Sequence, residues 1–395
     1  MGGVVDDCWR WLTASLALRP AVSHRQVRAL ALAEQLALAQ GRDHALEYGE
    51  EAVGLGRAAG DRLALARAAL LHGSALTGLF DHRERGVQLL DEAGVLLEAE
   101  GDDWSLATSA LARGAAALAR GDLHQAQDLL RYGADRFADV DNARGAAAAL
   151  RHLADLAIVR GRYDDAIAAL REALTGLDAN AAAGITSMAQ LGCLCAIQGR
   201  SGEADQWHAR ALAAAENQQH LPLLAFACNA KGLTLRRRGR LAEAEQCHQR
   251  ALSISRERGV PAALAMAHAS LGYIAELRND VTAADRHQQA SLNAACEAAD
   301  RQAQALALEG LASTASLRDD PKTAGKLLGA ATALREGSVV TAVGAATAQR
   351  GIALGHLDRV DIDRTIARVG GCPAYDRAYA EGLRDPQAVL TAVRV

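Results

Sequence analysis

The 395-residue chain has few aromatic residues and few prolines. Only 3% of its residues are aromatic although 50% are apolar, so a core must be built mainly from Ala and Leu, which favour helices. Most of the prolines lie where a helix would begin or between helices, as the missing N–H requires: Pro20, Pro222, Pro261, Pro321 and Pro386. This composition predicts an all-α fold.

The chain also has little net charge and no long apolar run. A formal charge of −4 gives no general attraction to nucleic acid or to an anionic membrane, and no segment approaches the roughly 20 apolar residues of a membrane-spanning helix. Asp6 and Asp7 lie where a secretory signal would need positive charge. The seven cysteines are an odd number without metal-finger spacing, which indicates reduced thiols. We therefore expect a cytoplasmic protein with no direct nucleic-acid partner and no membrane partner.

A turn signal recurs about every 40 residues along the chain. The tight turns are Gly41-Arg42, Phe80-Asp81, Gly121-Asp122, Gly161-Arg162, Gly199-Arg200, Gly239-Arg240, Asn279-Asp280 and Asp319-Asp320. Halfway between them lie looser breaks at Gly60, Gly101, Asp141, Asp178, Asn217, Gly259, Asp300 and Gly337. Gly and Asn tolerate the left-handed conformation that ends a helix, and Asp caps the next one. The repeating unit is therefore helix, tight turn, helix, looser turn.

Small residues recur at fixed offsets within this unit. Gly232 on a first helix is followed by Ala244 and Ala251 on the second, and the same offsets give Gly192, Ala204, Ala211; Gly272, Ala284, Ser291; Ala154, Ala166, Ala173; Gly114, Ala126, Gly133; and Ala312, Ala324, Ala331. Small side chains at these positions allow two helices to cross closely.

This pattern resembles the tetratricopeptide repeat (TPR), although the period is 40 rather than the usual 34 and Leu, Ala or His replace most of the large aromatics. The resemblance implies an all-α, right-handed TPR-like solenoid of about eight helix-turn-helix repeats over residues 21–336. Stacked repeats need capping ends. We expect an N-terminal capping segment at 1–20 and a C-terminal helical cap at 337–395.

A second resemblance covers nearly the whole chain. Trp9–Pro20 (WRWLTASLALRP), Leu327–Glu336 (LLGAATALRE), Ala374–Gly382 (AYDRAYAEG) and Gln387–Val389 resemble the C-terminal half of large bacterial ATP-binding transcriptional regulators of the LuxR and antibiotic-regulator types. In that family the repeat domain senses a signal and restrains an ATPase and a DNA-binding module. The sequence contains no G-x-x-x-x-G-K-[ST] phosphate loop and no helix-turn-helix motif. The resemblance therefore implies a stand-alone sensor half, with an ATPase or a DNA-binding regulator as its partner.

In TPR solenoids the first helices line a concave groove. That rule predicts ligand-facing side chains at Arg151, Asp155, Asn229, Leu233, Arg236, Tyr273, Glu276, Glu309 and Ser313, with an apolar middle of Ala189, Cys193 and Ala196. Such a groove suits a protein segment, a peptide or a small amphipathic effector. The alternative is that these residues form ordinary solvated or intrahelical pairs.

The densest basic run is Lys231, Arg236, Arg237, Arg238 and Arg240. It suits an acidic partner, because arginine binds carboxylate and phosphate in a bidentate manner. The alternative is a cationic helix C-terminus favoured by the helix dipole.

Metal and catalytic sites are not expected. His208 and His248 occupy equal positions in successive repeats, about 10 Å or more apart, which is too far to share an ion, and Cys193 and Cys195 point to different helix faces. No nucleophile elbow or paired-carboxylate spacing occurs. We predict a non-catalytic binding or sensor module of a transcriptional regulator, without cofactor. The alternative is a biosynthetic or hydrolytic enzyme that uses a cavity in an α-solenoid.

Overall fold

The computed structural model describes residues 2–17, 23–39, 42, 44–77, 82–335 and 359–393. Within these ranges the chain forms twenty helices and no strand. None of these helices combines the length and the apolar character that a bilayer crossing requires.

Sixteen of the helices form eight antiparallel repeats. The first helices are α2 (His24–Ala39), α4 (Arg62–Thr77), α6 (Asp103–Arg120), α8 (Ala143–Val159), α10 (Ala182–Ile197), α12 (Leu221–Arg237), α14 (Pro261–Leu277) and α16 (Arg301–Leu317). The second helices are α3 (Ala45–Ala59), α5 (Arg83–Glu100), α7 (Leu123–Asp139), α9 (Tyr163–Thr175), α11 (Ser201–Asn217), α13 (Leu241–Arg258), α15 (Val281–Glu297) and α17 (Pro321–Arg335). The predicted TPR-like solenoid with a period of about 40 is confirmed.

The remaining helices are α1 (Gly2–Ala17), α18 (Arg359–Val369), α19 (Pro373–Arg384) and α20 (Pro386–Val393). The predicted boundaries between the repeats and their caps, at 20/21 and 336/337, lie outside the described residues, as do Gly41, Phe80, Asp81 and Gly337 of the turn series.

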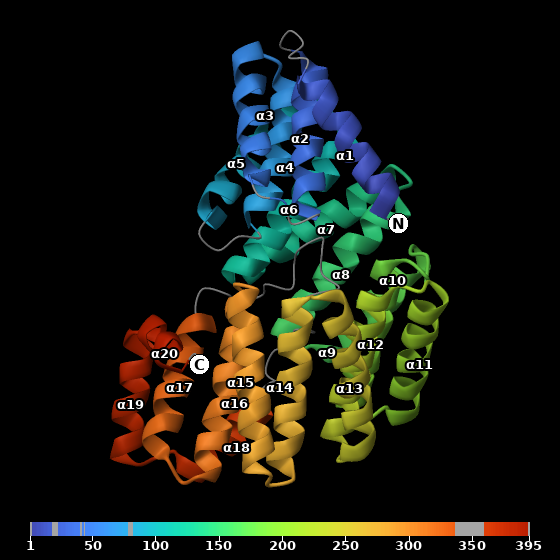
Figure 1. Ribbon diagram of the computed structural model, residues 1–395. Helices are drawn as coiled ribbons and strands as arrows, with labels where there is room; N and C mark the ends of the chain where they lie inside the picture. Colours follow the sequence, from blue (N-terminus) through green and yellow to red (C-terminus); the bar gives the residue numbers. More distant parts are fainter. Residues whose placement is uncertain are drawn as a thin grey trace. The chain divides into compact units, whose positions relative to one another are not determined.

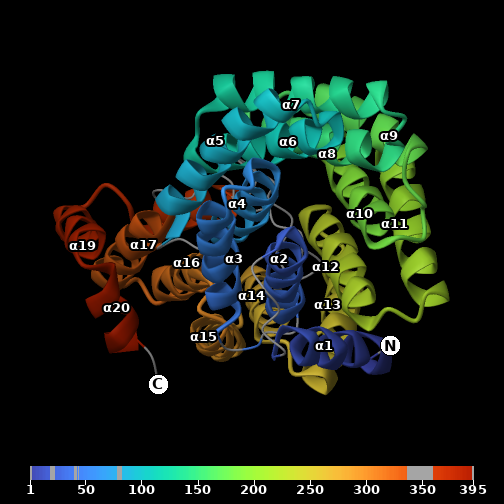
Figure 2. The ribbon, with the colours of Figure 1, turned by 90° about the horizontal axis from the view of Figure 1, so that it is seen from above.

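The described chain divides into two compact units. Unit 1 contains the described residues up to Leu153, and unit 2 contains those from Ala154 onward. Figure 1 shows α2 to α5 as neighbouring helices within unit 1. Within unit 2, the pairs from α10 to α17 lie side by side in chain order, and α19 follows next to α17 (Figure 2).

The tight turns have the left-handed backbone that the sequence predicts. In unit 2 the residues that end the first helices have positive φ: Gly161 (71°), Gly199 (72°), Gly239 (74°), Asn279 (60°) and Asp319 (55°). The side chain of Asp280 then caps α15 by accepting a hydrogen bond from the N–H of Ala283 at 2.9 Å. Each of these connections therefore ends one helix and starts the next with three intervening residues.

An ion-pair series repeats with the same period. An arginine that follows a first helix pairs with an acidic residue on the preceding second helix at 2.8, 2.8 and 3.2 Å in Arg238–Asp205, Arg278–Glu245 and Arg318–Asp285. Both members of each pair are 40 residues from their counterparts in the next. These contacts link neighbouring repeats and confirm that the repeats stack in phase.

In three repeats, an imidazole or an amide from the second helix fills the space beside a glycine of the first helix. A Cβ on Gly192 would lie 2.6 Å from the imidazole of His208, and a Cβ on Gly232 would lie 2.6 Å from that of His248. Gln288 occupies the same place beside Gly272. The glycines are therefore required for close packing of the two helices.

Helix α19 covers α17 at the end of the array, with glycines on both sides of the contact. A Cβ on Gly329 would clash with the backbone oxygen of Tyr379, and one on Gly382 would clash with that of Lys326. The Tyr379 hydroxyl donates to Thr332 Oγ1 at 3.0 Å. Residues 327–335 and 374–382, from two of the segments behind the second resemblance, therefore lie against each other.

Candidate functional site

The predicted ligand-facing residues in the last three repeats lie on the first helices, and most of them are buried. Arg236 on α12, Tyr273 and Glu276 on α14, and Glu309 on α16 are between 3% and 8% exposed. Their partners come mainly from α18, which lies beside α16 (Figure 1).

Helix α18 presents a charged stripe to these residues. Asp361, Arg364 and Arg368 are spaced by three and four residues, which places them on one side of the helix. The Arg236 guanidinium donates two hydrogen bonds, of 2.9 and 2.8 Å, to the two carboxylate oxygens of Asp361. This bidentate geometry is the strongest arrangement for such a pair, and both side chains are at most 10% exposed.

Glu276 binds the other end of the stripe. Arg364 Nε donates to the Glu276 carboxylate at 2.8 Å, and Arg368 donates to the same carboxylate at 2.7 Å. Arg364 also contacts Asp361 at 2.7 Å, and Arg368 reaches Ser316 Oγ at 3.4 Å. Helix α18 therefore contacts α12 through an aspartate, α14 through two arginines and α16 through the hydrogen bond from Arg368 to Ser316. We call the contacted residues Arg236, Glu276 and Ser316 the α18-binding face.

The partners of Asp361 and Arg364 on α18 favour the charged forms of both side chains. Burial alone would raise the pKa of Asp361, but its hydrogen bonds to Arg236 and Arg364 and their positive charges outweigh burial and lower it. Burial would lower the pKa of Arg364, yet its bonds to Glu276 and Asp361 raise it. Asp361 therefore stays negatively charged and Arg364 positively charged across the physiological range.

Tyr273 contacts Arg236 of the α18-binding face. The Arg236 guanidinium carbon lies 5.1 Å from the centre of the Tyr273 ring, within cation–π range. Burial, with the nearby charges of Glu309 and Asp361, raises the pKa of Tyr273 well above its usual value. The hydroxyl therefore stays neutral, and the ring serves as a platform for Arg236.

Glu309 belongs to a different pair. Arg335 on α17 donates to both of its carboxylate oxygens at 2.6 and 2.8 Å. The pair joins the two helices of the last repeat, and Ser313, one turn further along α16, is 1% exposed.

Two of the other predicted residues form hydrogen bonds within the repeats. Asp155 accepts a hydrogen bond from Gln190 at 3.0 Å, and Asn229 bonds to His248 at 3.0 Å. Arg151 lies one turn before Asp155 on α8 and is partly buried, as are Leu233 and Arg237 on α12 and Ala196 on α10. Ala189 and Cys193, the expected apolar middle, are buried in the core cluster between α10 and α12.

The basic run separates in space. Arg236 turns toward α18, whereas Arg238 binds Asp205 at 2.8 Å and Arg240 binds Glu243 at 2.7 Å. These three arginines therefore have different acidic partners.

His208 and His248 are internal. His208 Nε2 lies 2.9 Å from Thr234 Oγ1. Burial lowers the pKa of His208 to about 4 and, with the charge of Arg236, that of His248 to about 3, so both rings are neutral. Among the described residues, no group of three or more His, Cys, Asp or Glu side chains could hold a metal ion.

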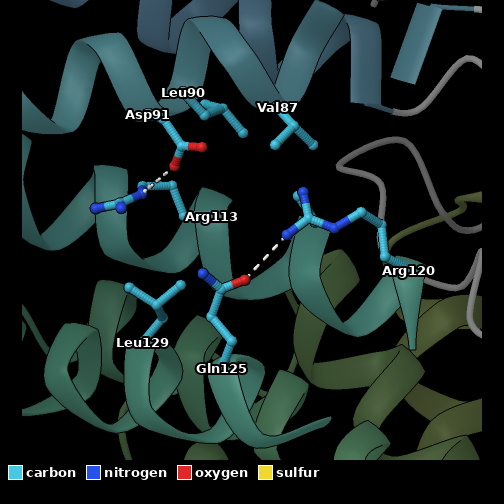
Figure 3. Close-up of a pocket in the computed structure, with 8 residues that line it drawn as sticks. Val87, Leu90, Asp91, Arg113, Arg120, Gln125 and Leu129 are labelled. Carbon is cyan, nitrogen blue, oxygen red and sulfur yellow. Dashed lines mark hydrogen bonds and ion pairs between the residues drawn. The ribbon is translucent and has the colours of Figure 1, made fainter. Parts of the chain in front are cut away.

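A small pocket in unit 1 lies between α5, α6 and α7 (Figure 3). Its polar side chains are paired, because Arg113 donates to Asp91 at 3.0 Å and Arg120 to Gln125 at 2.9 Å. A volume of about 10 Å³ is enough for one water molecule. It is too small for an organic ligand.

The sequence pattern placed Arg236, Tyr273 and Glu276 in one predicted groove and assigned 337–395 to a helical cap, but it did not predict that a helix of the cap would contact these residues. The signal was present as the stripe Asp361, Arg364, Arg368, with apolar Val360 and Ile366 elsewhere on the helix. Such a helix is expected to bury its apolar residues, yet Val360 is 55% and Ile366 36% exposed.

No family model matches the chain, and no curated protein matches it by sequence. Among solved structures, a Rap protein complexed with Competence and Sporulation Factor is 16% identical, with 94% of this chain and 100% of that chain covered and a TM-score of 0.58. The apo form of RapI is 10% identical, with 94% and 99% covered and a TM-score of 0.55. At this identity the likeness shows a shared fold. The chain has the fold of TPR-like helical-repeat proteins.

Proposed function

We propose that this protein is a non-catalytic binding module that holds a helical segment of a protein partner on the α18-binding face. One observation carries the proposal: this face already holds a helix, through Arg236, Glu276 and Ser316. Binding of an amphipathic helix by a complementary helical surface is a common mode of recognition.

The chemistry of the face favours a charged helix over an apolar small molecule. Buried charges are tolerated only when paired, so any occupant must supply an acid to Arg236 and a base to Glu276. The fold is compatible with this role, since a Rap protein of similar fold was solved with Competence and Sporulation Factor.

We further propose that the module senses a signal for a transcriptional regulator and that its partner is an ATPase or a DNA-binding regulator. This part of the proposal is supported by the segments Leu327–Glu336 and Ala374–Gly382, which resemble that class of regulators. The described residues of these segments pack together in α17 and α19.

The test is site-specific photo-crosslinking in the native cell. A benzoylphenylalanine at Leu233, which is partly buried and lies one turn before Arg236 on the same side of α12, should cross-link a protein that mass spectrometry identifies as an ATPase or DNA-binding regulator. The control is the same probe at Gln249, exposed on α13, which should not cross-link it. Cross-links from Gln249 alone, or recovery of only a chemically processed small molecule, would contradict the proposal.

A further inference from the structure

Helix α18 buries a charged residue, Asp361, on the same side as Thr365 and Val369. Thr365 is fully buried and Asp361 is 8% exposed, whereas Val360 is 55% exposed. Most surface helices bury an apolar stripe. Buried ion pairs give little net stabilisation compared with apolar packing, although they specify geometry. The contact is therefore specific without being strongly stabilising.

We infer that α18 is a displaceable occupant of the α18-binding face, and that the face recognises helices with an acidic residue followed three and seven residues later by arginines. A partner helix with this stripe competes with α18. This inference rests on the proposed function, because the competitor is the partner's helix.

The connections of α18 permit it to leave while its neighbours stay in place. It is joined to α19 through Gly370 and Gly371, and Gly371 has a φ of 78°. Glycine gives this junction backbone freedom. Helix α19 remains anchored, because Gly382 and Tyr375 pack directly against α17. On the other side, residues 336–358 separate α18 from α17 in the sequence.

Few apolar side chains lose their cover when α18 leaves. Val369 belongs to the core cluster around α16 and α17, and Ile362 packs against that cluster. The contacts of α18 with Arg236, Glu276 and Ser316 are polar, so water and a partner helix can each replace them.

Competition from α18 should weaken the binding of a free helix by an amount that can be measured. A tethered helix has an effective concentration on the order of 1 mM. A free helix with the same stripe must compete with α18 for the face. Its apparent affinity for the wild-type chain is therefore reduced by the ratio of the effective concentration of α18 to the dissociation constant of α18 for the face.

The test uses a fluorescein-labelled peptide with the sequence of residues 359–371 and the full-length chain. In the double variant D361R/R364E, α18 carries reversed charges and the binding face is unchanged. Fluorescence anisotropy should show the peptide binding this variant at least about tenfold more tightly than the wild type. The matched control is Ala367→Lys, which adds a charge at an exposed position of α18 and should bind as the wild type does. A peptide carrying the same reversed charges should not bind the double variant.

Equal affinity for wild type and double variant, or no binding to a folded double variant, would overturn the inference. If the double variant does not fold, hydrogen exchange of the wild-type chain tests the inference instead. Excess peptide should accelerate exchange in α18 but not in α19, and the reversed peptide should change neither. Unchanged exchange in α18 would also overturn the inference. Peptide displacement without a cross-linked partner at Leu233 would contradict only the proposed function, and a cross-linked partner without displacement would contradict only this inference.

Discussion

Three successive repeats match a glycine on the first helix with a large polar side chain on the second. The sets are Gly192 with His208, Gly232 with His248 and Gly272 with Gln288. The sequence predicted the glycines, because their spacing is regular. It did not predict their partners, because a histidine at a repeat position has the same pattern whether it fills a gap or binds a ligand.

The buried His248 should make stability depend on pH. Its pKa is about 3 in the folded chain, lowered by burial, against about 6.5 when unfolded. Below pH 6.5 the unfolded state binds the proton and the folded state does not, so stability is complete above that pH and falls on acidification. Wild type should lose about 2 kcal/mol more than His248→Gln between pH 7 and pH 5, measured by urea denaturation. The substitution reproduces the glutamine of the next repeat, and parallel pH profiles would contradict this assignment.

A methyl group at the α17–α19 contact should destabilise the chain. Gly382→Ala would place a Cβ against the backbone oxygen of Lys326, and overpacking of this kind costs about 1–3 kcal/mol. The control is Gly202→Ala on α11, where no atom lies within 4 Å of the new Cβ. Its effect should stay within about 0.5 kcal/mol. Equal urea midpoints for the two variants would refute the close contact.

Helices and turns were largely predictable, since both follow from local rules. Periodic Ala and Leu predicted the helices, and Gly239, Asn279 and Asp319 predicted their ends through the left-handed backbone. Helix α18 was not predictable in the same way. Arg236 and Asp361 are 125 residues apart, and no local rule connects an arginine in one repeat with an aspartate beyond the last repeat.

The turn at Gly239 offers a test of this local rule. Gly239→Ala should lower stability by roughly 1–2 kcal/mol, the cost of a left-handed backbone for a residue with a Cβ. Gly239→Asn should cost less, because Asn279 takes the same conformation at the equivalent place. Thermal melts of the two variants provide the measurement. A larger loss for Asn than for Ala would show that the turn is maintained in another way.

In a stacked array each repeat depends on its neighbours, and the end repeats need cover. The two ends of this chain differ in how much they bury. Helix α19 buries Tyr375 and Ala378 and α20 buries Val389 and Leu390, whereas Trp11 on α1 is 80% exposed. The resemblance to TPR proteins predicted that caps exist but not which end is more strongly bound, because that depends on tertiary packing.

Truncations should reveal this difference between the ends. A chain lacking residues 371–395 leaves Leu327 and Leu328 of α17 uncovered and should bind a hydrophobic dye and aggregate on size exclusion. A chain lacking residues 1–22 should elute and melt nearly as the wild type does. The opposite ranking of the two truncations would mean that the first repeats, and not the last, depend on their cap.

The order of charged residues along α18 fixes the register in which this helix packs on the α18-binding face. Sliding the helix by one turn would bring Arg364 opposite Arg236 and place two positive charges together in a region with little water. A one-turn slip is therefore rejected by electrostatic repulsion. The same repulsion acts on any partner helix. The α18-binding face therefore selects partner helices by the position of each charge along the helix as well as by the charges they carry.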